Sequence, residues 1–176
     1  AQIDFVEIER IYRLEEARGI DVSADRARTD RLRRGYDEYL SGLDLSRAGQ
    51  HGPALERLRR AGEAGVVQAQ YAVGKYYEGE LGVAANYAEA YRWHSMAVRD
   101  PTVAHADAAY AVGSLLYLNV PGVTQNQRAA PYYWYSASQR NHAYAMLALG
   151  MAFQHGTGLS RNRDEALCWY RRALAA

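Results

Sequence analysis

Small and large apolar residues recur along this chain with the spacing of one helix face. Three glycines, Gly74, Gly113 and Gly150, stand 39 and 37 residues apart, and each has alanine five positions before it and an aliphatic residue one position before it. A large apolar residue follows each glycine three positions later, at Tyr77, Leu116 or Phe153. Positions four apart share one face of an α-helix, so the pattern predicts a helix around each glycine and a repeated unit.

A second helix is predicted in each copy, after a glycine-bearing loop at residues 79–83, 119–123 and 156–159. Glycine and proline at these places end the first helix and permit a tight connection. Each copy then has an aromatic residue followed four positions later by alanine, in the pairs Trp93 and Ala97, Tyr133 and Ala137, and Trp169 and Ala173. Small residues let helices cross closely and aromatic residues fill the space beside the crossing, so stacked helix pairs are expected.

A fourth and shorter copy of the pattern lies upstream of the other three. It begins at Gly42 and has its small residues at Ala54 and Ala61, because its loop is four residues shorter. The turn of this copy is assigned to three residues, Gly49, Gly52 and Pro53.

The N-terminal residues predict two further helices. Asp4 and Glu7 form a capping box that opens a helix through about Arg18. Residues 19–23 read as a break, and Ser23 is expected to cap a longer helix.

The third full copy resembles the Sel-like repeat (SLR). The resemblance rests on the run 145–159 followed by 164–173, and the shorter upstream copy is more similar to the tetratricopeptide repeat. It implies an all-α fold, a right-handed superhelix (solenoid) of antiparallel helix pairs with the first helices lining a concave surface. The expected organisation is an N-terminal helical segment (1–35), a tetratricopeptide-like repeat (36–65) and three SLR units (66–104, 105–141 and 142–176).

The same resemblance implies a protein that acts through contacts with another protein or peptide, as adaptor, regulator or inhibitor. Such proteins are most often bacterial and exported, which favours the periplasm over the cytoplasm. Two departures from the family pattern stand out. The family's frequent paired cysteines are absent, and His94 occupies a core position that the other copies fill with Trp134, Tyr170 or Leu58.

Composition excludes several classes of partner. The chain has 21 basic and 20 acidic residues, a formal net charge of +1, so no field attracts nucleic acid. No apolar stretch approaches the roughly 18 to 20 residues that span a bilayer, so no membrane insertion is expected. Cys168 is the only cysteine, which excludes an intramolecular disulfide, and beside Trp169 it is expected to be buried.

No candidate catalytic, cofactor or metal site follows from the motifs, and the chain is not expected to be an enzyme. The five histidines have no zinc-site spacing and are interpreted mostly as loop or surface residues. The segment Gly156-Thr157-Gly158 follows no strand, and the repeat already explains its glycines. The densest acidic cluster, Glu7, Glu9, Glu15 and Glu16, reads as a solvated helix face.

Tyrosine, at 15 of 176 residues, carries the strongest functional pattern. Tyr39, Tyr71 and Tyr110 stand three positions before repeat glycines, an offset that projects toward the concave face in this type of repeat. Tyrosine suits interfaces because it combines a rigid ring with a polar tip. The interpretation that these rings merely pack between helices remains open. The other candidate partner-binding residues are Tyr36, Lys75, Glu78, Ser114, Tyr117, Tyr144, Met151 and Gln154.

Several forms of the binding function remain open. One is an immunity protein that neutralises a secreted bacterial toxin, another a periplasmic regulatory or envelope-assembly scaffold, and a third a non-catalytic domain of a cell-wall-related enzyme system. The last helix ends at Leu174-Ala175-Ala176 without a polar cap, so a homo-oligomer joined through this C-terminal repeat is a further alternative.

Overall fold

The computed structural model describes residues 3–79, 81–100 and 105–176. Ala1, Gln2, Glu80 of the first loop and the predicted boundary between residues 104 and 105 lie outside these ranges. Within them, the regular secondary structure is entirely α-helical, which confirms the predicted all-α class.

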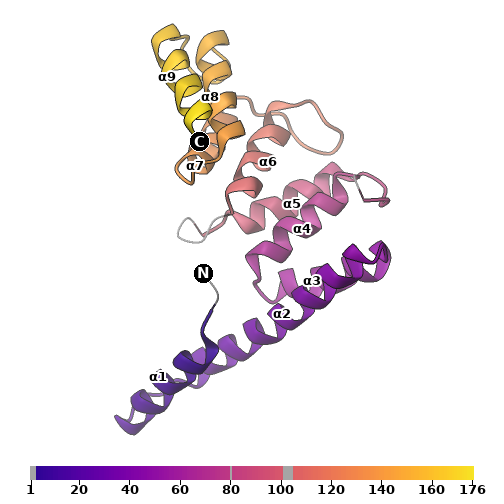
Figure 1. Cartoon of the computed structure of the whole chain (residues 1–176), viewed down its shortest axis with the longest axis vertical. Coiled ribbons are helices and arrows are strands. Elements are labelled where there is room, and N and C mark those ends of the chain that lie inside the picture. Colours follow the sequence, from indigo (N-terminus) through magenta and orange to yellow (C-terminus); the bar gives the residue numbers. More distant parts are fainter. Residues whose placement is uncertain (1–2, 80, 101–104) are drawn as a thin grey trace. The chain divides into compact units, whose positions relative to one another are not determined.

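The helices fall into two compact units, Ala1–Val66 and Val67–Ala176. The first unit contains α1 (Phe5–Ala17), α2 (Ser23–Arg47) and α3 (His51–Glu63). The second unit contains α4 (Val67–Tyr77), α5 (Tyr87–Ala97), α6 (Ala106–Tyr117), α7 (Ala130–Ser138), α8 (Ala143–His155) and α9 (Arg163–Ala175) (Figure 1).

The first unit is a set of antiparallel helices that are held together partly by ion pairs. The Asp4 carboxylate accepts the backbone N–H groups of Val6 and Glu7, at 3.1 and 3.0 Å, so the predicted start of α1 is confirmed. Arg26 of α2 donates hydrogen bonds to both Glu9 and Glu16 of α1. The acidic cluster therefore does more than face solvent, because two of its members hold α1 against α2.

Two local expectations for the first unit are wrong. Ser23 is the first residue of α2 and not its cap, and its N–H donates to the Asp21 carboxylate at 2.9 Å. The turn before α3 contains Gly49, with φ of +73°, while Gly52 and Pro53 lie in the first turn of α3. Proline is tolerated there because a first-turn N–H has no partner within the helix. The helix α2 also continues without a break across residues 35 and 36.

The second unit consists of three stacked helix pairs, α4–α5, α6–α7 and α8–α9 (Figure 1). Successive pairs are in contact through α5 with α6 and through α7 with α8, and α4 also contacts α6. This is the repeating helix pair that the three glycine-centred copies predict.

Each repeat glycine lies where the first helix of its pair crosses the second. The facing side chains are those the sequence alignment places in register: His94 against Gly74, Trp134 against Gly113 and Tyr170 against Gly150. Gly42 faces Leu58 in the same way within the first unit. A Cβ atom at any of these glycines would overlap the facing side chain, so glycine is required for the close approach of the two helices.

The last helix corrects the expectation for Cys168. Ala166 and Trp169 are the buried residues of α9, whereas Cys168 is exposed. Consecutive helical residues point about 100° apart, so burial of Trp169 turns its neighbour toward the edge of the helix.

Candidate functional site

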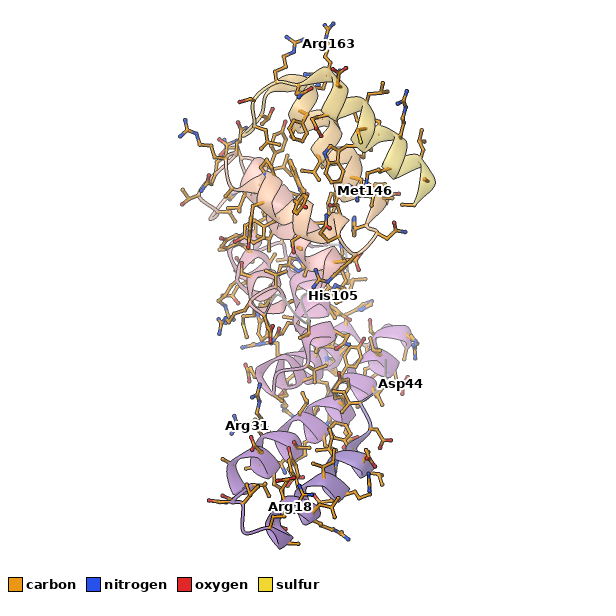
Figure 2. The ribbon with its side chains drawn as sticks, turned by 90° about the vertical axis from the view of Figure 1, so that its left-hand side faces the viewer. Arg18, Arg31, Asp44, His105, Met146 and Arg163 are labelled. Carbon is orange, nitrogen blue, oxygen red and sulfur yellow. The ribbon has the colours of Figure 1, made fainter. Side chains whose placement is uncertain are left out.

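The first helices of the second unit line an open cavity of about 480 Å³. Tyr71 and Lys75 come from α4, Tyr110 and Ser114 from α6, and Tyr144 from α8. These elements are equivalent in successive repeats, so the cavity is built by repetition of one helix face. His105, labelled in Figure 2, lies at the start of α6 as its N-terminal cap residue.

A second cavity of about 250 Å³ adjoins the first. The two share Tyr110, Ser114 and Leu118, and the second adds Tyr117 and Met151. Because they share a wall, we refer to the two cavities together as the inner groove.

The structure places eight of the eleven predicted partner-binding residues in the inner groove. These are Tyr71, Lys75, Glu78, Tyr110, Ser114, Tyr117, Tyr144 and Met151. Gln154 does not line it; this exposed residue accepts a hydrogen bond from the Tyr170 hydroxyl. Tyr36 and Tyr39 belong to the first unit, where the ring centroids of Tyr36 and Phe5 are 6.1 Å apart and those of Tyr36 and Tyr39 are 6.5 Å apart.

Tyrosine and histidine rings stack between successive repeats beside the groove. Tyr71 stacks on His105, with centroids 4.4 Å apart and planes 16° from parallel. Tyr110 stacks on His142 in the same way, at 4.8 Å and 25°. The two interpretations of these tyrosines therefore do not compete, because each ring packs between repeats and also lines the groove.

His142 has a defined orientation and tautomer. Its Nδ1 accepts the backbone N–H of Ala145 at 3.1 Å, which caps α8. In a neutral ring the proton is then on Nε2, which lies 3.2 Å from Oδ1 of Asp107. Nδ1 of His105 lies 3.6 Å from the other oxygen of Asp107, so this carboxylate stands between two imidazoles.

A second polar cluster joins α4 to α5 at the edge of the groove. The Glu78 carboxylate accepts from Lys75 at 2.6 Å and lies 2.9 Å from Nε2 of His94. Burial alone raises the pKa of Glu78, but the hydrogen bonds from His94 and Lys75 outweigh it and leave that pKa below its ordinary value. Glu78 is therefore ionised at neutral pH, and its charge is matched by Lys75.

His94 occupies the core position that the repeat alignment gives it, and His105 and His142 lie in the non-helical turns before α6 and α8, yet none of the three is fully exposed. The side chain of His94 is fully buried, and those of His142 and His105 are only 10% and 22% exposed. The repeat alignment carries a signal for two of them: His105 and His142 each stand eight residues before a repeat glycine. Asp107 was missed because it has no equivalent acid in the other repeats.

Stability should fall as the solution becomes mildly acidic, because of His105. Burial lowers the pKa of His105 below its ordinary value, against the opposing effect of Asp107. The unfolded chain therefore takes up this proton first, and stability is lost as pH falls through about 6.5. The Glu78 contribution has the same sign but a lower pH range, since its lowered pKa keeps the contribution intact until pH falls below about 4.5.

The measurement is the urea midpoint of unfolding at pH 7.5 and at pH 5.5. Wild type should have the lower midpoint at pH 5.5, and His105→Phe, which keeps a ring against Tyr71, should show a smaller difference between the two pH values. An equal difference in both proteins would contradict the assignment to His105.

The described part of the chain has no cluster of three or more histidine, cysteine or acidic side chains placed to hold a metal ion. None of the helices in the described ranges is both long enough and apolar enough to cross a membrane.

Stacked helix pairs with an aromatic groove on one face define a helical-repeat protein, a class that acts by binding other proteins. The Sel1 repeat model matches three consecutive segments, 67–100, 106–142 and 143–176, which together are more than half of the chain. The chain therefore belongs to the Sel1 repeat family, whose members are protein-interaction modules, in agreement with the resemblance found in the sequence.

Two fungal proteins are similar in sequence. The chain is 29% identical over 123 residues to the chitin synthase regulator SKT5 of Malassezia restricta and 34% identical over 101 residues to chitin synthase regulatory factor 2 of Schizosaccharomyces pombe. The matches cover 69% and 57% of this chain but only 8% and 19% of those relatives.

Two bacterial structures share the fold. A Sel1 repeat protein from Oxalobacter formigenes is 29% identical, with a TM-score of 0.69 over 78% of this chain and 55% of that one. A protective antigen of uropathogenic Escherichia coli, described as displaying an SLR fold, is 22% identical, with a TM-score of 0.65 over 99% of this chain and 33% of its own.

Proposed function

We propose that this chain binds a segment of another protein in the inner groove. The observation that carries the proposal is that large apolar side chains stay exposed there: Tyr144 is 69% exposed, and Leu118 and Met151 are 49% exposed. Exposed aromatic and methionine side chains in a concave site are typical of binding surfaces.

The form of this function that the relatives support is regulatory. Both fungal relatives are named as regulators of chitin synthase, so the proposed partner is an enzyme whose activity changes on binding. A non-catalytic role in a cell-wall-related enzyme system agrees with those names. An immunity protein against a secreted toxin, or a periplasmic or envelope-assembly scaffold, would use the same groove with a different partner. Because the named relatives are fungal, they lend the predicted periplasmic location no support.

Self-association through the last repeat stays a separate proposal. Leu167 and Leu174 of α9 are 48% and 89% exposed, and an apolar cavity of about 550 Å³ involves Tyr135 and Trp169 beside that helix.

The binding proposal is tested with a peptide library displayed on phage and selected against the immobilised full chain. Enriched peptides are expected to lose about 2–4 kcal/mol of binding free energy when Tyr71 and Tyr110 are both replaced by alanine, the range of interface hot spots. Affinity is measured by isothermal titration calorimetry, with helicity checked by circular dichroism.

The matched control is the double replacement of Tyr132 and Tyr135 by alanine, two tyrosines of α7 that are 72% and 53% exposed and lie outside the inner groove. Tyr144→Ala adds a groove variant whose ring is mostly exposed, so its loss should weaken binding while leaving the fold intact. Equal effects of the groove and control variants would sink the proposal.

A further inference from the structure

Among the described residues, the larger cavity of the inner groove has one acidic lining residue that no basic lining residue compensates. Its charged lining residues, among those the structure describes, are Lys75, Glu78 and Asp107. Lys75 and Glu78 form an ion pair at 2.6 Å and cancel each other. The ion-pair contacts of Asp107 are with the imidazoles of His105 and His142.

The hydrogen bond made by one imidazole and the burial of the other disfavour a positive charge on either ring. Nδ1 of His142 accepts a backbone N–H and so carries no proton. Burial keeps the pKa of His105 below its ordinary value, so this ring is neutral as well. Among the described residues that line the cavity, no cationic side chain therefore pairs with the Asp107 carboxylate.

The cluster of Asp107, His105 and His142 is also incomplete as a hydrogen-bonding site. Oδ1 of Asp107 lies 3.2 Å from Nε2 of His142, and Oδ2 is 3.6 Å from Nδ1 of His105, too far for a hydrogen bond. Nδ1 of His105 is buried and has no hydrogen-bond partner among the described residues. The Asp107 side chain is 52% exposed. A donor group that enters the cavity can therefore reach Oδ2.

Aromatic rings line the same cavity as Asp107. The rings of Tyr110 and Tyr144 have centroids 6.4 Å apart, and Tyr71 lines the cavity with them. The negative face of a tyrosine ring attracts a cation within about 6 Å of its centroid, and a neighbouring carboxylate adds a direct charge attraction.

We propose that this cavity binds an arginine side chain of the partner segment, against Asp107 and the tyrosine rings. The inference rests on the proposed function and names the chemistry that the groove recognises. Arginine fits better than lysine because its planar guanidinium stacks on aromatic rings and offers five N–H donors, whereas the lysine ammonium is a compact and strongly hydrated charge.

The test is a titration of the ¹⁵N-labelled full chain, followed by NMR, with N-acetyl-arginine methylamide. Saturable shifts are expected at the backbone amides of Asp107, Tyr110 and Tyr144. The citrulline analogue, which has nearly the same shape and no charge, should bind at least about tenfold more weakly, as expected for loss of a charge pair and a cation–π contact. The lysine analogue should lie between the two.

The variants are Asp107→Asn and a matched control, Asp164→Asn. Both aspartates lie in the first turn of a helix, so both replacements remove a similar interaction with the helix dipole. Asp164 lines none of the cavities described above. Asp107→Asn should weaken arginine binding at least about tenfold and Asp164→Asn should leave it unchanged. Equal binding of arginine and citrulline, equal behaviour of the two variants, or no saturable shift would overturn the proposal.

The phage-selected peptides separate this inference from the proposed function. If they bind the groove through Tyr71 and Tyr110 but need no arginine and ignore Asp107→Asn, the function stands and the arginine site falls. If no peptide depends on the groove tyrosines while the arginine titration behaves as expected, the proposed function falls and the cation site stands.

Discussion

Replacement of Trp93 by alanine is expected to lower the free energy of unfolding by about 3–5 kcal/mol, the range for deletion of a large buried aromatic side chain. Trp93 lies on α5 and is completely buried, as the largest such side chain in the described structure. Its removal leaves a cavity that the surrounding close-packed side chains can fill only in part.

The matched variant is Trp93→Phe. The indole N–H of Trp93 is buried and has no hydrogen-bond partner among the described residues, so phenylalanine loses packing area but no hydrogen bond. Trp93→Phe should therefore lower the free energy of unfolding much less than Trp93→Ala does. Urea unfolding followed by circular dichroism measures both, with hydrogen exchange showing whether the repeats open separately, as repeat arrays can. A loss below about 1 kcal/mol for Trp93→Ala would contradict the role given to this residue.

The repeat architecture could be predicted from the sequence because the close approach of two helices restricts residue type so strongly. Gly74 and Gly113 recur because a Cβ atom there would overlap the ring of His94 or Trp134. This steric requirement acts within one helix pair and is the same in every copy. Glycine therefore recurs at a regular spacing that can be recognised in the sequence. The offset of Tyr71 and Tyr110 from the repeat glycines, together with the resemblance to the repeat family, predicted that they lie on the face that lines the groove.

The cluster of Asp107, His105 and His142 beside the groove could not be predicted in the same way. Asp107 comes from the start of α6 and His142 from the start of α8, and their 3.2 Å contact depends on how far one repeat is displaced from the next. That displacement is set by the packing of whole helices and has no signature in residue spacing. Cys168 was placed wrongly for a related reason, since a rotation of α9 by a single position decides which neighbour of Trp169 is buried.

The first unit shows the limit of periodic reasoning more plainly. Its contact between α1 and α2 includes the hydrogen bonds that Arg26 donates to Glu9 and Glu16, which are 17 and 10 residues away in the sequence. Arginine and glutamate are also the ordinary residues of exposed helix faces, so their types alone do not distinguish a bridge between helices from a solvated surface.

Replacement of Gly158 by alanine is expected to lower the free energy of unfolding by about 2–5 kcal/mol, the sum of a strained backbone and an overpacked contact. Gly158 has φ of +69°, a left-handed conformation that L-residues adopt at a cost of about 1–2 kcal/mol. A Cβ atom there would also overlap the backbone carbonyl of Gln127 and lie 3.1 Å from Cα of Arg128, in the loop of the preceding repeat. Backbone atoms cannot rotate away as a flexible side chain does.

Gly156→Ala is the matched control, because Gly156 has nearly the same backbone conformation, with φ of +75°, but an added Cβ atom would meet neighbours only at 3.5 Å or more. It should therefore show the backbone cost alone, about 1–2 kcal/mol. The difference between the two variants measures how tightly the loops of successive repeats are packed. Gly158→Ala should speed amide hydrogen exchange both in the 118–129 loop and in the 156–162 loop that contains Gly158. Gly156→Ala should speed exchange only in the 156–162 loop. If both variants cost the same and neither changes the 118–129 loop, the two loops do not stabilise each other, and the second and third repeats are held together by their helices alone.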